Sequence, residues 1–247
     1  MTDLGPPPRA VLFDAGGTLV LLDTARVATT LAGLGLSVTP EAVRAAEGPA
    51  RRVYERFLAE GGRHADGWGV YARVALERAG VPRERLADAA LAVRAEHDRR
   101  NLWSVPAPGV QDCLQRLRDA GLRLGVVSNS EGTIGAMLAE IGLAPFFEVV
   151  VDSHFEGVQK PDPEIFRRAL QRMGALEPTD VAYVGDVPGV DVAGARAAGL
   201  RAILVDPADA FADFEGAPRI RSLAELSERW APPRPERAPF DRDAAGR

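Results

Sequence analysis

Residues 10–18 read Ala-Val-Leu-Phe-Asp-Ala-Gly-Gly-Thr, a short apolar run that ends in an aspartate and a glycine-rich turn. Four consecutive apolar residues are typical of a strand that is covered on both faces. An aspartate beside glycines is also common in ordinary turns, so this stretch alone does not establish a functional site. It predicts where the first strand of a sheet ends and where polar side chains begin.

Further apolar runs follow along the chain and alternate with helical patterns, at residues 122–127, 147–151, 181–184 and 201–205. Residues 110–117 and 134–141 carry apolar side chains at i, i+3, i+4 and i+7, and each segment is followed by a glycine suited to a helix C-cap. Asp162-Pro163 is typical of a helix start. The alternation predicts an α/β fold, with a parallel sheet covered by helices on both faces.

Residues 21–104 differ from this pattern, since they show helical periodicity and no convincing strand. We therefore expect a helical insertion at 21–104, within an α/β core formed by residues 9–20 and 105–228. The hinges are expected near residues 19–24 and 104–109, where Pro106 and Pro108 interrupt regular structure. The terminal segments 1–8 and 231–247 are expected to be flexible, the latter because prolines alternate with charges.

Composition excludes several classes of protein. The chain has 247 residues, 46% of them hydrophobic, and a net charge of −5, which is unlike a nucleic-acid-binding or membrane-surface protein. The N-terminus does not resemble a signal peptide, and no apolar run approaches membrane-spanning length. The single cysteine, Cys113, cannot form an internal disulfide. A cytoplasmic protein without nucleic-acid or membrane partners is expected, and its state as monomer or homodimer stays open.

Polar residues follow the apolar runs at four places: Asp14, Ser128 with Asn129, Lys160, and Asp186 with Asp191. Each alone has an ordinary explanation as a turn residue, a cap or a surface charge. In an open α/β sheet, however, the carboxyl ends of the strands converge on one crevice. Lys160 is also the only lysine among 30 basic residues. Loss of lysine elsewhere is compatible with genome composition, but its retention at this position needs another reason.

The four places, in this order, resemble the motifs of the haloacid dehalogenase-like hydrolase superfamily, over about residues 9–226. The resemblance implies a Rossmann-like core with an inserted α-helical cap. It also implies that Asp14 is a nucleophile, that Ser128 is the hydroxyl of the second motif, and that Lys160 is the motif lysine. Asp186 and Asp191 match the acidic pair of the fourth motif.

The chemistry of a phosphoryl group agrees with these roles. Phosphoryl transfer depends on positioning and charge neutralisation, and two carboxylates in one crevice need a cation between them, for which oxygen ligands favour Mg²⁺. We expect Asp14, Asp186 and Asp191 to hold or orient it, and the resemblance adds the main-chain carbonyl of Gly16. Ser128, Asn129, Lys160 and Thr18 are expected to bind a small phosphorylated molecule, with an aspartyl-phosphate formed on Asp14.

Gly16 departs from the family pattern, because phosphatases of this family usually carry there an aspartate that acts as acid and base. Three interpretations follow. The first is a Mg²⁺-dependent phosphatase that obtains its acid elsewhere or acts on a substrate with a good leaving group. The second is another chemistry: Gly185-Asp186 argues against a metal-independent 2-haloacid dehalogenase, and a cap without lysine argues against phosphonate cleavage. The third is a catalytically weak or inactive protein that binds metal and phosphate.

The cap contributes candidates with ordinary alternatives. His64, His97, Glu60 and, outside the cap, His154 are possible replacement acids, although structural roles are more common for such residues. The cap arginines Arg51, Arg52, Arg56 and Arg63 are interspersed with glutamates, so we expect a solvated helix face rather than a substrate site. Trp68 and Tyr71 fit either the cap core or a pocket wall.

Overall fold

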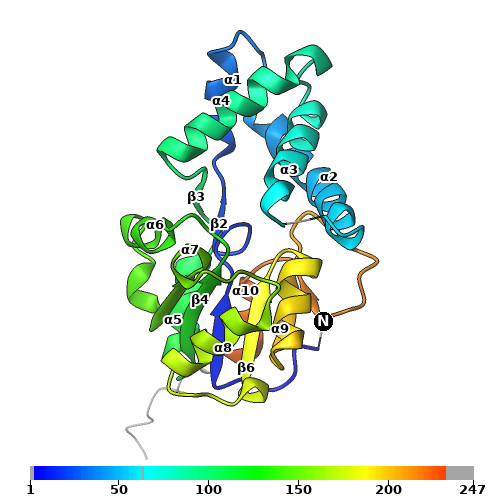
Figure 1. The fold of residues 1–247 in the computed structure, drawn as a ribbon. Coiled ribbons are helices and arrows are strands. Elements are labelled where there is room, and N and C mark those ends of the chain that lie inside the picture. Colours follow the sequence, from blue (N-terminus) through cyan, green and yellow to red (C-terminus); the bar gives the residue numbers. More distant parts are fainter. Residues whose placement is uncertain (1–2, 63, 232–247) are drawn as a thin grey trace, which may run out of the picture.

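The core of the protein is a parallel sheet of six strands, described here in a computed structural model for residues 3–62 and 64–231 (Figure 1). The strands lie in the order β5-β4-β1-β6-β7-β8, and every neighbouring pair is parallel. Their bounds are β1 Ala10–Phe13, β4 Arg123–Ser128, β5 Val149–Asp152, β6 Val181–Gly185, β7 Arg201–Val205 and β8 Arg219–Ile220. The α/β fold is as predicted, and β1 lies in the middle of the sheet.

Apolar side chains on both faces of the sheet hold this core together. Val11 and Phe13 of β1 pack into one buried cluster, and Ala10 and Leu12 pack into another on the opposite face. This alternation follows from the period of two in a strand. The helices of the core are α5 Val110–Asp119, α6 Ile134–Glu140, α7 Ser153–Glu156, α8 Pro163–Arg172, α9 Ala193–Ala197 and α10 Ala224–Trp230.

A separate group of helices, called the cap below, lies beyond the carboxyl ends of the strands (Figure 1). It comprises α1 Thr24–Ala32, α2 Pro40–Ala59, α3 His64–Arg78 and α4 Leu86–Arg99. These helices have their own buried cluster, which includes Leu31, Val43, Leu76 and Ala89. No helix within residues 3–62 and 64–231 has both the length and the apolar character needed to cross a membrane.

The helical group is joined to the sheet by a two-stranded antiparallel ribbon, β2 Val20–Leu22 and β3 Trp103–Pro106. The expectation of no strand near the ends of the insertion was wrong, because each strand is very short and pairs with a partner about eighty residues away. Pro106 does not interrupt regular structure but closes β3, opposite Val20. Proline is tolerated at such a position because an edge strand leaves one row of N–H groups unpaired.

Local predictions for the core agree with the structure. The expected strands overlap β1, β4, β5, β6 and β7, and the side chain of Asp162 accepts a hydrogen bond from the N–H of Glu164 as the N-cap of α8. In the described part of the terminal segments, Leu4 is buried and Trp230 donates to the carbonyl of Gly5. Residues 1–2 and 232–247 of the predicted flexible termini lie outside the described residues.

Candidate active site

Four polar side chains meet where the strands of the sheet end. Asp14 follows β1, Ser128 is the last residue of β4, and Asp186 follows β6. Lys160 lies in the loop that leads into α8. Because neighbouring strands are parallel, their carboxyl ends converge, and the four side chains all border one cavity.

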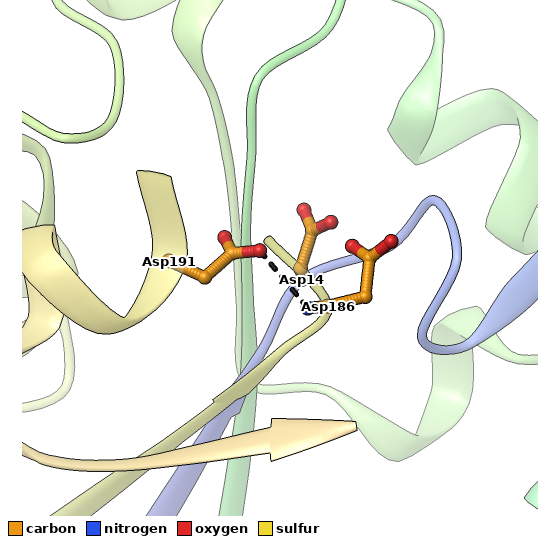
Figure 2. Close-up of side chains that lie close together, drawn as sticks. All are labelled: Asp14, Asp186 and Asp191. Carbon is orange, nitrogen blue, oxygen red and sulfur yellow. Dashed lines mark hydrogen bonds between the residues drawn. The ribbon is translucent and has the colours of Figure 1, made fainter. Parts of the chain in front are cut away.

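Three carboxylates form the centre of this arrangement (Figure 2). Asp14, Asp186 and Asp191 are buried, and one carboxylate oxygen from each lies within 4.8 Å of the others. Asp191 reaches the group from a short helical turn, Pro188–Val192, that follows β6. Three negative charges at this separation repel one another strongly in a buried environment, so the cluster needs positive charge.

Lys160 supplies part of that charge. Its Nζ donates to Oδ1 of Asp14 at 2.6 Å, to Oδ1 of Asp191 at 2.7 Å and to the hydroxyl of Tyr183 at 2.8 Å. The side chain is only 2% exposed. Burial alone would lower the pKa of Lys160, but the carboxylates of Asp14 and Asp191 outweigh it and raise that pKa. The lysine is therefore fully charged at neutral pH.

Asp191 acts as a positioning group within the cluster. Its Oδ2 accepts the backbone N–H groups of Asp186 at 3.0 Å and Val187 at 2.9 Å, and its Oδ1 accepts from Lys160. Tyr183 also contacts Oδ1, at 3.2 Å, and donates its hydroxyl to the carbonyl of Val127 at 2.9 Å. These contacts fix the loop that carries Asp186 and orient the lysine toward Asp14.

Burial disfavours the ionised form of the carboxylates. Burial raises the pKa of Asp14 despite the attraction of Lys160, and burial also raises the pKa of Asp186 to about 7. A divalent cation with a preference for oxygen ligands would stabilise the ionised forms. The donor set of three buried carboxylates therefore fits Mg²⁺.

The residues expected to bind phosphate take different positions. Ser128 is buried at the end of β4 and borders the cavity. Asn129 borders it too, but its side chain is hydrogen-bonded to the main chain of Lys160. Nδ2 donates to the carbonyl of Lys160 at 2.9 Å, and Oδ1 accepts from the main-chain N–H of Lys160 at 2.8 Å. Thr18 is 1% exposed, is absent from the wall of this cavity, and its hydroxyl lacks a hydrogen-bond partner in the described residues.

The cavity has a volume of about 460 Å³ and lies between the sheet and the helical cap. On the sheet side it is bordered by the carboxylates, Lys160 and Gly16. On the cap side its walls are aromatic and basic, formed by Arg51, Tyr54, Trp68, Tyr71, Arg94, His97 and Trp103. The wall that faces the carboxylates thus comes from residues 51–103, far from them in sequence.

Arg51 is the clearest difference from the sequence-based expectation. The hypothesis of a solvated arginine face was wrong for this residue, which is buried and lies 3.1 Å (Nη1) from Oδ2 of Asp186. Its Nη2 is 3.5 Å from Oε2 of Glu47, one helical turn earlier. Arg52 and Arg56 are exposed as expected, and Arg63 lies outside the described residues.

Of the possible replacement acids, only His97 borders the cavity within the described side chains. Its Nδ1 accepts the N–H of Leu102 at 3.2 Å, and its Nε2 is 3.4 Å from Oε2 of Glu131. Burial lowers the pKa of His97, so the ring is neutral near pH 7. Glu60 and His154 are exposed and away from the cavity, and the side chain of His64 is outside the description.

Two functional neighbours were missed from the sequence. Tyr183 is an aromatic residue with a hydroxyl in an otherwise aliphatic buried strand, a signal that could have marked it. Glu131 lies just after the Ser128-Asn129 motif and accepts from Arg94 of the cap at 2.6 Å. No local pattern in the sequence pointed to that contact, because its partner lies in helix α4, far from it in the sequence.

Comparisons with known proteins agree with this geometry. Residues 8–199 match the model of the haloacid dehalogenase-like hydrolase family. A phosphoserine phosphatase of Thermus thermophilus is 39% identical over 162 residues, which cover 63% of this chain and 61% of that protein. A phosphoglycolate phosphatase of Chromobacterium violaceum is 33% identical over 228 residues, covering 88% of this chain and 94% of the relative. Three curated relatives are matched over only 40% to 61% of their own length.

A solved structure of a phosphatase from Thermococcus onnurineus has a similar fold. It superposes with a TM-score of 0.57 at 26% identity, covering 90% of this chain and 99% of that one. Together with the arrangement of Asp14, Lys160, Asp186 and Asp191, the family match over residues 8–199 decides the classification. The chain belongs to the haloacid dehalogenase-like hydrolase family.

Proposed function

We propose that the chain is a Mg²⁺-dependent phosphatase that hydrolyses a small phosphorylated metabolite through an aspartyl-phosphate on Asp14. The observation that supports this best is the contact of the only lysine with Oδ1 of Asp14 at 2.6 Å. Relatives named as phosphatases favour a phosphorylated substrate. We expect the protein to act in the cytoplasm.

In this proposal the residues of the site act on the nucleophile, the phosphate or the cation. Asp14 attacks phosphorus while Lys160 keeps its carboxylate ionised and oriented. The hydroxyl of Ser128 and the main-chain N–H of Asn129 bind the phosphate oxygens. Asp14, Asp186 and the carbonyl of Gly16 would hold Mg²⁺, with Asp191 orienting the site from outside. The ion would neutralise charge on the phosphoryl group.

The bonds change in two steps. In the first, an oxygen of Asp14 forms a bond to phosphorus as the bond from phosphorus to the leaving oxygen breaks. In the second, the oxygen of water forms a bond to phosphorus as the bond from phosphorus to Asp14 breaks; inorganic phosphate leaves, the proton of the water passes to the phosphate or to solvent, and the carboxylate is restored. The protein's own groups supply orientation and charge in both steps.

Binding without efficient turnover is the second candidate function. The observation that favours it is Gly16, which has no side chain to act as acid or base where the family usually carries an aspartate. A positioned acid or base contributes about 10²- to 10⁴-fold in rate. A metal-independent 2-haloacid dehalogenase is less well supported, because Asp186 is part of a carboxylate cluster that fits a cation.

Phosphate release from an aryl phosphate tests the proposal. The native protein should release phosphate with Mg²⁺ and lose this activity with a chelator, and Asp14→Asn should be inactive under both conditions. Arg56→Gln, which changes an exposed cap residue, serves as the matched control. Absence of release above the Asp14→Asn background would overturn the phosphatase proposal. Haloacid substrates without metal, and then phosphate binding, would be measured next.

A further inference from the structure

The space beside Gly16 is taken by an aromatic side chain of the ribbon. A Cβ atom built on Gly16 would lie 3.5 Å from Cδ1 and 3.6 Å from Cγ of Trp103. These are ordinary van der Waals distances, and the backbone of Gly16 is outside the left-handed region, so the main chain does not require glycine there. The indole therefore lies in van der Waals contact with the position that a Cβ at residue 16 would take.

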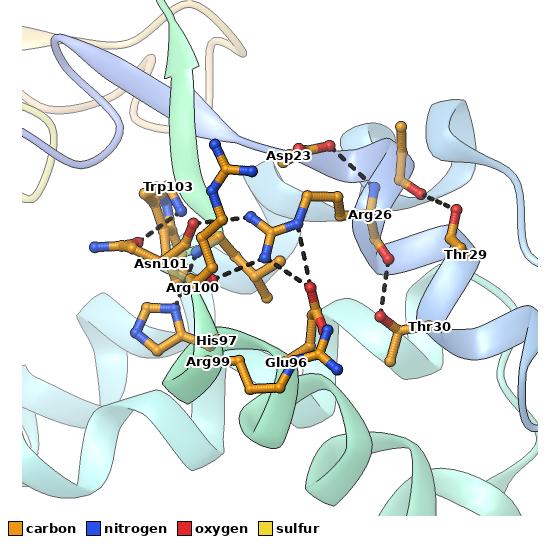
Figure 3. A network of polar contacts seen from close by, with 12 residues as sticks. Asp23, Arg26, Thr29, Thr30, Glu96, His97, Arg99, Arg100, Asn101 and Trp103 are labelled. Carbon is orange, nitrogen blue, oxygen red and sulfur yellow. Dashed lines mark hydrogen bonds and ion pairs between the residues drawn. The ribbon is translucent and has the colours of Figure 1, made fainter. Parts of the chain in front are cut away.

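Trp103 is held firmly in that place (Figure 3). Its main-chain N–H donates to Oδ1 of Asn101 at 2.8 Å. Arg26 of the cap donates to the carbonyls of Arg100 at 2.9 Å and Asn101 at 3.0 Å. The indole also packs on Tyr71, with ring centroids 5.9 Å apart. These contacts hold the main chain of residues 100–103 and place the ring of Trp103 against Tyr71.

Two titratable groups of the cap wall, His97 and Tyr71, are paired with other side chains. The remaining ring N–H of neutral His97 is directed at Glu131, and Tyr71 donates to Glu47 at 3.5 Å. Glu131 accepts from Arg94 at 2.6 Å. His97 and Tyr71 are therefore paired with other side chains and are not free to protonate a leaving oxygen.

The leaving group must occupy the cap side of the cavity. In phosphoryl transfer the attacking and leaving oxygens lie roughly in line through phosphorus. Asp14 attacks from the sheet side, so the leaving oxygen departs toward the cap wall, where Trp68, Tyr71 and Trp103 lie. Three aromatic side chains provide favourable stacking and edge contacts for a planar ring.

We propose that the substrate is a phosphate monoester whose leaving group is an aromatic ring bearing a weakly basic oxygen. This inference rests on the proposed function. As the bond from Asp14 to phosphorus forms, the bond to the aryl oxygen breaks and its electron pair stays on that oxygen. The group departs as an aryloxide anion and takes its proton from water afterwards. No acid at position 16 is then needed.

The leaving-group dependence of kcat/KM tests this inference, because kcat/KM reports the transfer of phosphate to Asp14. We would measure a series of substituted phenyl phosphates, from electron-poor to unsubstituted rings, together with one alkyl phosphate. The native protein should lose roughly 10²-fold or more between the most electron-poor aryl phosphate and the alkyl phosphate, since an unassisted alkoxide departs poorly.

Two substitutions at one position sharpen the test. Gly16→Asp should raise kcat/KM for the alkyl phosphate by about 10-fold or more and flatten the dependence, because it restores an acid. Gly16→Ala adds a Cβ without a carboxylate and should keep the dependence steep. Since a side chain at position 16 would contact Trp103, the double variant Gly16→Asp with Trp103→Leu covers the case in which the single variant does not fold.

The outcomes distinguish a wrong substrate class from a wrong phosphatase function. A shallow dependence, with alkyl and aryl phosphates cleaved alike, would overturn the proposed substrate class while the phosphatase function stands. Folded Gly16→Asp protein with an unchanged steep dependence would show that the missing acid does not set the preference. No phosphate release from any member of the series would overturn both the function and the substrate class.

Discussion

The guanidinium of Arg51 lies 3.1 Å from the carboxylate of Asp186, which connects cap helix α2 directly to the carboxylate cluster. Both side chains are at most 10% exposed. A second contact nearby, from the N–H of Gly189 to Oε2 of Glu55 at 3.0 Å, joins the same helix to the same loop. The cap therefore contributes charge to the site as well as a wall.

Removing Arg51 should change cation and substrate binding in opposite directions. Arg51→Gln takes a positive charge away from Asp186, so Mg²⁺ should bind roughly 3- to 10-fold more tightly and a phosphate dianion more weakly by a similar factor. Isothermal titration with Mg²⁺ and the KM for an aryl phosphate measure the two effects. Arg52→Gln, an exposed change on the same helix, is the control. If both affinities fell together, Arg51 would be orienting Asp186 rather than competing with the cation.

Turnover of a good aryl substrate should begin with a burst. The position that usually activates water is Gly16, so hydrolysis of the aspartyl-phosphate should be slower than its formation. Stopped-flow measurement should then show one equivalent of aryloxide released rapidly, followed by a slower steady rate. Gly16→Asp should shrink the burst by accelerating the second step. A linear time course from the first turnover in the native protein would contradict this order of rates.

The ionisation of Asp186 should make the metal-free protein less stable at high pH. Burial raises the pKa of Asp186 from 3.8 to about 7, so the folded state holds a proton there that the unfolded state has lost. Stability from this group is therefore present at low pH and lost as the pH rises through about 7. Asp186→Asn should remove this pH dependence, although it also leaves the buried Arg51 without its carboxylate partner, so the expected effect is on the change in stability between low and high pH.

Denaturant unfolding with a chelator, at pH 5 and pH 8, measures this effect as the difference between the native protein and Asp186→Asn. The free energy of unfolding of Asp186→Asn minus that of the native protein should be more positive at pH 8 than at pH 5. Mg²⁺ should stabilise the native protein more than the variant, since an ion that binds only the folded state adds stability. An equal difference at both pH values would contradict the raised pKa.

Lys160 should matter for stability as well as for chemistry. Lys160→Met leaves the carboxylates of Asp14 and Asp191 without their shared cation, and breaking a buried ion pair in this way costs about 3–5 kcal/mol. The double variant Asp14→Asn with Lys160→Met should lose less than the sum of the two single losses. Thermal unfolding of the four proteins in the cycle gives the coupling. Additive losses would mean that the 2.6 Å contact contributes little.

Much of the core was predictable because its signals are local. Apolar runs of four to six residues identified β1, β4, β6 and β7, and the rule that parallel strands end at one edge brought Asp14, Ser128 and Asp186 together, whereas Lys160 reaches the site from the loop before α8. Asp162 was recognisable as a helix cap from its own neighbours. In each case the deciding interaction lies within one element or follows from sheet geometry.

The cap side of the site was not predictable, because its contacts join distant segments. Glu47 and Arg51 have the i, i+4 spacing of a surface ion pair, and nothing nearby in the sequence reveals that Arg51 also meets Asp186. Trp103 beside Gly16 depends on a ribbon of two very short strands. Such contacts depend on how the cap packs on the core, which local periodicity does not encode.

The ribbon of β2 and β3 allows the helices of the cap to be exchanged without altering the sheet. Its two strands are hydrogen-bonded neighbours, so the inserted segment leaves the sheet and returns at a single place. An insertion whose ends are adjacent can be lengthened, shortened or exchanged without shifting the register of the sheet. Trp103 belongs to the ribbon itself, and its ring also packs on Tyr71 of the cap. Evolution can then change the range of substrates by replacing helices while the chemical step keeps its requirement for a weakly basic leaving group.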